Sequence, residues 1–257
     1  MQWPLEGRVA VVTGGSGDLG LAMAQALADA GASIVLASRD LKRLESARAR
    51  MSVDDAHIWT RPVDVTDATQ VRSLMEATLV RFKRLDILVN AAGIQLRKSA
   101  MELTPEEWNR VLNVNLSGTF YCCQAAARSM LQRRSGRIIM ISSLTAEIGI
   151  PKIAPYVASK GAIRQLTKTL AVEWAPFGIT VNSIGPGRFK TSMTEDVFSD
   201  DSIRESFLRL IPMGRAGVPA DLAGITVFLA SDASAYITGQ SIYVDGGWLA
   251  AGGSPLG

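Results

Sequence analysis

The chain has 257 residues, 47% of them hydrophobic and 20% charged, and its 27 basic and 24 acidic side chains give a net charge of +3. This length allows one large α/β domain or two small ones, and this apolar content excludes an intrinsically disordered chain. The small, dispersed positive charge excludes an electrostatic footprint for nucleic acid.

Short apolar runs alternate along the chain with stretches of helical periodicity. The apolar runs predict strands at residues 8–13, 33–38, 58–63, 85–90, 137–141, 179–184 and 241–244. The periodic stretches predict helices at residues 19–30, 41–51, from 67 onward, 154–176, and at 104–134 with an interruption near Ser117-Gly118. This alternation predicts a doubly wound Rossmann-type α/β fold, a seven-stranded parallel sheet with helices on both faces, in one domain over residues 1–257.

Residues 187–213 form the least regular stretch of the sequence. They are polar but include Met193 and Phe198, and they predict a substrate loop or lid with one short helix. The two side chains are expected to pack this loop, and a direct contact with substrate is the less favoured alternative.

Counts of single residue types restrict the possible chemistry. His57 is the only histidine, and its position before the apolar Ile58 and Trp59 favours a structural role over a Ser-His-Asp hydrolase. Cys122 and Cys123 are adjacent, which excludes a disulfide framework and a zinc-finger spacing, so no metal is expected. No secretory signal or apolar stretch of about 20 residues is visible, so we expect a cytoplasmic protein without a membrane partner.

A glycine-rich turn follows the first expected strand. Gly15, Gly17 and Gly20 satisfy the pattern G-x-G-x-x-G between a strand and a helix. In that setting the glycines allow a tight turn and the close approach of a pyrophosphate, so a dinucleotide site is favoured over an ordinary strand–helix turn. Asp18 would repel a phosphate if it faced inward, so we expect its side chain to face solvent or to cap the helix.

The end of the second expected strand indicates which dinucleotide is bound. A carboxylate at this point holds the free ribose of NAD(H), whereas arginine suits the 2′-phosphate of NADP(H). Ser38 removes the carboxylate and Arg39 supplies the cation, so the sequence predicts NADP(H). Asp40 keeps NAD(H) open as the alternative, but it is better placed to cap the helix beginning at Leu41.

Tyr156 and Lys160 are spaced to lie side by side on one helical face. A nearby lysine cation stabilises a phenolate, so we expect the pKa of Tyr156 to fall and the phenol to exchange a proton with an alcohol or carbonyl oxygen. Ser143 lies at the end of an earlier expected strand, where active residues of open α/β sheets collect.

These motifs follow one another in a recognisable order over nearly the whole chain: Thr13 to Gly20, Asp64-Val65, Asn90-Ala91-Ala92-Gly93, Asn113-Val114-Asn115, Ser143, Tyr156 with Lys160, Pro186-Gly187 and Asp245-Gly246-Gly247. In this order they resemble the short-chain dehydrogenase/reductase family, and short segments resemble its gluconate 5-dehydrogenase-like branch. The chain departs from the family pattern at Asp18, where glycine is usual, and at Ala91, where asparagine is usual.

The resemblance implies a role for each residue of a catalytic set. Tyr156 would be the acid and base, Ser143 would steady the substrate oxygen, Lys160 would bind the nicotinamide ribose, and Asn115 would position a water. Substrate contacts are expected from Gln95, Ser143, Glu147 and Tyr156. With the glycine turn and the strand end, the expected cofactor contacts are Gly14, Ser16, Gly17, Asp18, Leu19, Gly20, Ser38, Arg39, Asp64, Val65, Asn90, Ala91, Gly93, Tyr156, Lys160, Pro186, Gly187, Phe189, Thr191 and Met193.

The function implied by the resemblance is hydride transfer between NADP(H) and an alcohol/ketone pair, in an enzyme that assembles as a homotetramer. Polar residues expected at the cleft mouth, Gln95, Arg97, Glu147, Arg188 and Lys190, favour a sugar or sugar acid such as 5-keto-gluconate. The alternatives are a 3-oxoacyl-carrier-protein reductase, a reductase of hydrophobic ketones and a non-catalytic dinucleotide sensor.

Overall fold

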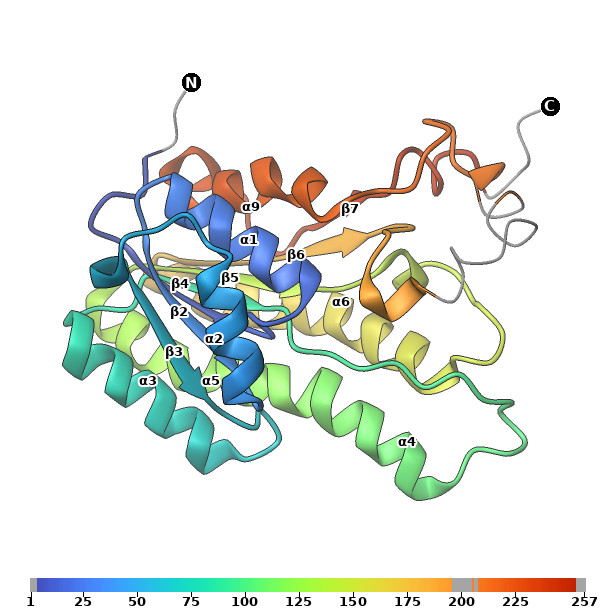
Figure 1. The fold of residues 1–257 in the computed structure, drawn as a ribbon, viewed down its shortest axis with the longest axis horizontal. Coiled ribbons are helices and arrows are strands. Elements are labelled where there is room, and N and C mark those ends of the chain that lie inside the picture. The colour runs from blue at the N-terminus through green and yellow to red at the C-terminus, as the bar shows by residue number, and fades with distance from the viewer. Residues whose placement is uncertain (1–3, 196–204, 206–207, 253–257) are drawn as a thin grey trace.

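The protein is represented by a computed structural model that describes residues 4–195, 205 and 208–252. Within this part of the chain, seven strands form one entirely parallel sheet in the order β3-β2-β1-β4-β5-β6-β7 (Figure 1). The strands are β1 Val9–Thr13, β2 Ser33–Ser38, β3 Ile58–Pro62, β4 Ile87–Asn90, β5 Gly136–Ile141, β6 Ile179–Pro186 and β7 Ser241–Val244.

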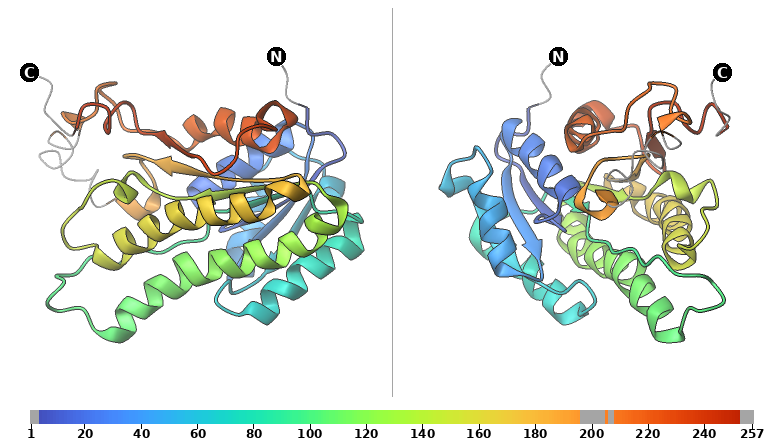
Figure 2. Two further views of the ribbon diagram at one scale, coloured as in Figure 1. Left: turned by 180° about the vertical axis from the view of Figure 1, so that it is seen from behind. Right: turned by 45° about the vertical axis from the view of Figure 1, so that its right-hand side comes forward.

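Helices cover both faces of this sheet, as Figure 2 shows. The helices are α1 Asp18–Asp29, α2 Leu41–Ala49, α3 Ala68–Phe82, α4 Pro105–Leu112, α5 Gly118–Arg133, α6 Ala154–Trp174 and α9 Ala223–Ala230. One buried apolar cluster joins the sheet to α3, α5 and α6, and a second joins it to α1, α2 and α9. The doubly wound Rossmann architecture expected from the sequence is confirmed.

Polar side chains set the starts of several helices. Asp40 caps α2 by accepting the backbone N–H of Arg43, as expected, and Asp67 caps α3 in the same way. Thr104 and Glu107 form a reciprocal capping box at the start of α4. These local bonds explain why helix starts could be read from the sequence.

The helix expected over residues 104–134 is not continuous. A π-helical turn over Asn113–Ser117 separates α4 from α5 and carries Asn115, whose side chain is buried. The interruption expected near Ser117-Gly118 is therefore present, as a π-helical turn that ends at Ser117. Such turns occur frequently at functional sites.

The amino ends of the strands are held by ion pairs, one group of which surrounds the buried carboxylate of Asp86. The carboxylate of Asp86, just before β4, accepts from the Val9 backbone N–H at 2.9 Å, from Arg84 Nε at 2.7 Å and from Arg133 Nη2 at 2.5 Å. Burial alone would raise the pKa of this carboxyl, but the hydrogen bonds outweigh burial and hold the pKa below its ordinary value. At the same end, Arg8 and Arg137 both pair with Asp232.

The loop or lid expected over residues 187–213 is described only in part. The described part contains the short helical turn η5 at Ser192–Thr194, and Phe198 lies outside the described residues.

His57 is exposed at the end of a 3-10 turn. The described ranges contain no group of three or more His, Cys, Asp or Glu side chains placed to hold a metal. None of the described helices is both long enough and apolar enough to cross a membrane.

Candidate active site

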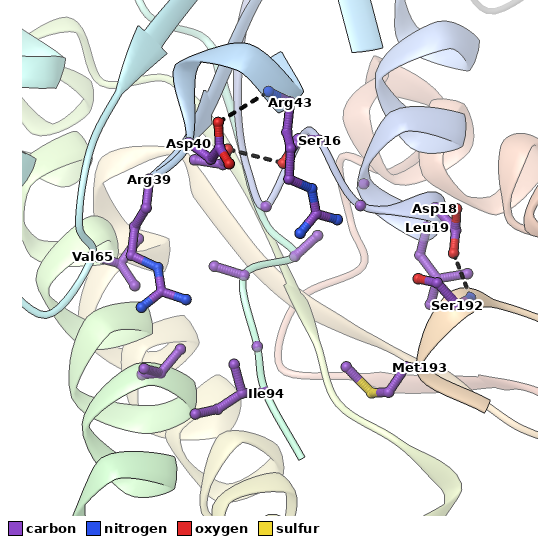
Figure 3. A pocket seen from close by; sticks show the side chains of 18 of the residues that line it. Ser16, Asp18, Leu19, Arg39, Asp40, Arg43, Val65, Ile94, Ser192 and Met193 are labelled. Atoms are coloured by element: carbon purple, nitrogen blue, oxygen red, sulfur yellow. Dashed lines mark hydrogen bonds between the residues drawn. The ribbon is translucent and has the colours of Figure 1, made fainter. Parts of the chain in front are cut away.

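A cavity of about 640 Å³ opens at the carboxyl ends of the central strands (Figure 3). Its walls come from the turn after β1, the ends of β2 and β3, the loop after β4 and the segment after β6. Among the expected cofactor contacts it is lined by Gly14, Ser16, Gly17, Asp18, Leu19, Gly20, Ser38, Arg39, Asp64, Val65, Ala91, Gly93, Thr191 and Met193.

The remaining expected cofactor contacts do not line this cavity. Asn90 is buried, donates to Cys123 Sγ at 3.2 Å, and its Oδ1 has no hydrogen-bond partner in the described part of the chain. Pro186 and Gly187 end β6 and turn toward β7, where the Gly187 N–H donates to Val244. Phe189 is only 5% exposed and packs in the core.

The glycine turn is packed too tightly for side chains. Gly14 has a φ of +67°, and a Cβ there would lie 2.6 Å from the backbone of Ala91 and Ala92. Gly17 is the N-cap of α1 and offers no side chain to the first N–H groups of that helix. At its glycines the turn therefore presents backbone to the cavity, which suits a pyrophosphate.

Asp18 does not behave as the sequence suggested. It is the first residue of α1 rather than its cap, and its partly exposed carboxylate bonds to a distant segment. Asp18 Oδ2 accepts the backbone N–H of Ser192 at 2.7 Å (Figure 3). A partner 174 residues away could not be read from local sequence.

Two arginines stand at the β2 end of the cavity. Arg39 follows β2, and Arg43 lies in the first turn of α2; Figure 3 shows both guanidinium groups pointing into the cavity. Between them, Ser16 Oγ donates to Ser38 Oγ at 2.9 Å. Arg43 was not among the residues expected from the sequence. The cap at Asp40 could have indicated it, because this cap places position 43 on the first turn of α2, next to the end of β2.

Asn115 is tied to the loop after β4. Its Oδ1 accepts the Ile94 backbone N–H at 2.8 Å, and its Nδ2 donates to the Ile94 carbonyl at 2.9 Å and to Ser159 Oγ at 3.1 Å. The side chain is 1% exposed. The π-helical turn thus fixes the loop wall of the cavity through a paired amide.

Lys160 and Tyr156 lie together on α6, but their electrostatics differ from the expectation. Lys160 Nζ donates to the Ile141 carbonyl at 2.7 Å and lies 5.5 Å from the centre of the Tyr156 ring. Burial lowers the pKa of Lys160 to about 8. Burial also raises the pKa of Tyr156, and the hydrogen bond with Ser143 only partly opposes this. The expected fall in the pKa of Tyr156 is therefore not found for the chain alone, because burial outweighs the hydrogen bond with Ser143.

Gly93 shows that the cavity reaches this cluster. It lines the cavity, and a Cβ built on it would lie 3.4 Å from Asn115 Oδ1 and 3.9 Å from Lys160 Nζ. Ser143 is joined to Tyr156 by its hydroxyl. The structure therefore brings together the four residues of the expected catalytic set, next to the cavity wall at Gly93.

The expected substrate contacts divide into two groups. Gln95 and Arg97 line the cavity. Glu147 does not: its carboxylate accepts from the Tyr243 hydroxyl at 2.5 Å and pairs with Arg164 Nε at 2.7 Å. The expectation that Glu147 contacts substrate is not supported, because its charge is already matched by residues of β7 and α6.

Arg188 adds a second cation close to Arg97. Its guanidinium stacks over the ring of Trp248 at 5.6 Å from the ring centre. Burial, and then the charge of Arg97, lower the pKa of Arg188 to about 10.

The chain was compared with known proteins. A family model described as enoyl-(acyl carrier protein) reductase matches residues 16–249. Gluconate 5-dehydrogenase of Gluconobacter oxydans is 38% identical over 95% of both chains, and a 3-oxoacyl-(acyl-carrier-protein) reductase of Synechocystis is 39% identical over 95% of this chain and 98% of the relative. The crystal structure of a gluconate 5-dehydrogenase from Burkholderia cenocepacia in complex with NADP and tartrate is 37% identical, with a TM-score of 0.91 over 97% of this chain and 98% of the other. With these matches over almost its full length, the chain belongs to the short-chain dehydrogenase/reductase family of oxidoreductases.

Proposed function

We propose that the protein is an NADP(H)-dependent oxidoreductase that interconverts a sugar acid and its keto form, such as gluconate and 5-keto-gluconate. The observation that carries this proposal is one continuous cavity, with Arg39 and Arg43 at one end and Gly93 against Asn115 and Lys160 at the other. Such a cavity can hold a phosphorylated dinucleotide whose reactive end meets the proton-donating cluster.

The residues present fit NADP(H). The bare backbone of the glycine turn suits the pyrophosphate, and Asp64 with Val65 would contact the adenine. Arg39 and Arg43 supply the two cations that a 2′-phosphate attracts, and Ser38 supplies no competing carboxylate. The Burkholderia cenocepacia relative described above is in complex with NADP, which supports this choice.

The chain's own groups would handle the oxygen of the substrate. The Ser143 hydroxyl would hold the carbonyl oxygen, and Tyr156 Oη would give it a proton as the carbonyl becomes an alcohol. The Lys160 ammonium would bind the nicotinamide ribose and help restore the tyrosine proton, and Asn115 would position a water for that purpose. Bound NADPH supplies the hydride that reduces the carbonyl carbon.

A carboxylated substrate fits the charges beside this cluster. Arg97 lines the cavity beside Gln95, and Arg188 lies close enough for its pKa to respond to Arg97. A guanidinium group such as that of Arg97 can bind a carboxylate with two parallel hydrogen bonds. The relatives named for gluconate, and the tartrate in the Burkholderia cenocepacia complex, support a polyhydroxy acid. A homotetramer, a cytoplasmic location and a lid role for residues 187–213 belong to the same proposal.

Replacing Arg39 and Arg43 together by alanine tests the cofactor. We expect KM for NADPH to rise by at least about tenfold, because a charged hydrogen bond contributes about 1.5–3 kcal/mol. KM for NADH should change little, since NADH lacks the phosphate. The matched control is Arg72→Ala, an arginine in α3 bonded only to Thr69 among the described residues. A wild-type enzyme with a higher kcat/KM for NADH would contradict the assignment.

A matrix of cofactors and substrates tests the reaction. The wild-type enzyme should reduce 5-keto-gluconate with NADPH at a kcat/KM at least tenfold above that for an apolar aryl ketone, about 1.4 kcal/mol of transition-state preference. An acetoacetyl thioester belongs in the panel because of the Synechocystis relative. A higher kcat/KM for the thioester or the aryl ketone would replace the sugar-acid assignment.

A further inference from the structure

The side chain of Asp18 connects two walls of the cavity. It begins α1, whose cap is Gly17, and it lies where the family pattern has glycine. Its Oδ2 accepts the Ser192 backbone N–H at 2.7 Å, and both residues line the cavity. Figure 3 shows this bond running from the glycine turn to the segment that follows β6.

Within the described part of the chain, the other hydrogen bonds of residues 189–194 run inside the segment or to Gly217. Thr194 Oγ1 donates to the Phe189 carbonyl at 2.7 Å and accepts the Thr191 N–H at 3.1 Å, while the Lys190 N–H donates to the Gly217 carbonyl at 2.9 Å. Considering the described residues alone, no second hydrogen bond joins residues 14–20 to residues 189–194. Among the described residues, Asp18 therefore makes the one hydrogen bond that links this wall to the turn.

The chemistry of the pair explains why the bond is strong. A carboxylate accepts but does not donate, so Asp18 cannot itself bind a phosphate, and its charge opposes one. The Ser192 N–H opens the turn η5 and has no acceptor within that turn. A charged acceptor on an uncommitted backbone N–H makes a hydrogen bond stronger than one between neutral groups.

We propose that Asp18 is a positioning residue that holds Thr191, Ser192 and Met193 against the glycine turn, so that this wall of the cofactor cavity is formed before the dinucleotide binds. The proposal rests on the proposed function only for the identity of the ligand. A preformed wall removes an ordering cost from cofactor binding. The Asp18 carboxylate therefore has two opposite effects on the affinity for the dinucleotide. Holding the wall in place raises the affinity, and the negative charge near the phosphates lowers it.

Two substitutions separate them. Asp18→Asn keeps an oxygen that can accept the Ser192 N–H but removes the charge, whereas Asp18→Ala removes both. The control is Asp29→Ala, which removes an exposed carboxylate from the far end of α1. Hydrogen exchange of the Ser192 amide is measured in the full chain without cofactor, and the Kd for NADPH is measured by fluorescence titration.

Asp18→Ala should exchange the Ser192 amide about tenfold faster than wild type, with Asp18→Asn within about threefold and Asp29→Ala unchanged. The Kd for NADPH should be about tenfold higher in Asp18→Ala than in Asp18→Asn, since neither carries the charge and only the second keeps the bond. Equal exchange in Asp18→Ala and wild type, or equal Kd values in the two variants, overturns the proposal. A wild-type chain that binds no NADPH would overturn the proposed function, while the exchange measurement would still decide whether Asp18 holds the segment.

Discussion

Tyr156→Phe should lower kcat for ketone reduction by 10²- to 10⁴-fold, the usual contribution of a positioned proton donor. Phenylalanine keeps the ring that packs 5.5 Å from the Lys160 ammonium, so the fold and the Kd for NADPH should remain close to wild type. Because burial holds the pKa of Tyr156 above its ordinary value, the wild-type phenol stays protonated through neutral pH, as a proton donor must.

The measurement is steady-state kcat with NADPH and the best ketone of the substrate panel, together with a fluorescence titration of NADPH. Tyr236→Phe is the matched control. Tyr236 is fully exposed, so this substitution removes the same hydroxyl without removing a buried contact. If Tyr156→Phe kept more than about a tenth of the wild-type kcat, the proton would have to come from another group.

Asp86→Asn should lower the free energy of unfolding by about 3 kcal/mol, the lower end of the range for breaking a buried ion pair. The substitution leaves Arg84 and Arg133 without their shared anion, although both keep partial access to water, with side chains 44% and 31% exposed. Asp55→Asn breaks an exposed pair with Arg48 and should change the same quantity by less than about 1 kcal/mol.

The effect of Asp86 should depend on pH in one direction. Its pKa in the folded chain is below the unfolded value of about 3.9, so its stabilisation is fully present above that value and is lost as pH falls through the folded pKa. Urea unfolding at neutral pH and at several values below pH 4 checks this. If the difference in the free energy of unfolding between wild type and Asp86→Asn grew as pH falls, the proposed role of the Asp86 carboxylate would be contradicted.

The fold could be predicted because its signals are local. A strand buried on both faces must be apolar throughout, so runs such as 33–38 stand out, and caps such as Asp40 act over three residues. The interruption near Ser117-Gly118 could also be expected from composition, whereas its π-helical geometry could not.

The errors in the site have long-range causes. Asp18 and Glu147 were assigned from their neighbours in sequence, but Ser192 and Tyr243, which bind them, lie 174 and 96 residues further along. The pKa of Tyr156 was judged from its spacing to Lys160, whereas burial by the whole fold raises it. Arg43 was missed because a charged residue on a helix usually faces solvent.

The two ends of the sheet have different roles, stability at one end and ligand binding at the other. Asp86, Arg137 and Asp232 hold the amino ends of the strands together, and every group assigned to ligand binding lies at or beyond the carboxyl ends. A substitution in the loops around the cavity therefore leaves the ion pairs of the sheet intact, so natural selection can alter ligand preference without first restoring stability. Divergence by small steps on an unchanged frame accounts for how relatives 38% and 39% identical to this chain are named for a sugar acid and for an acyl thioester.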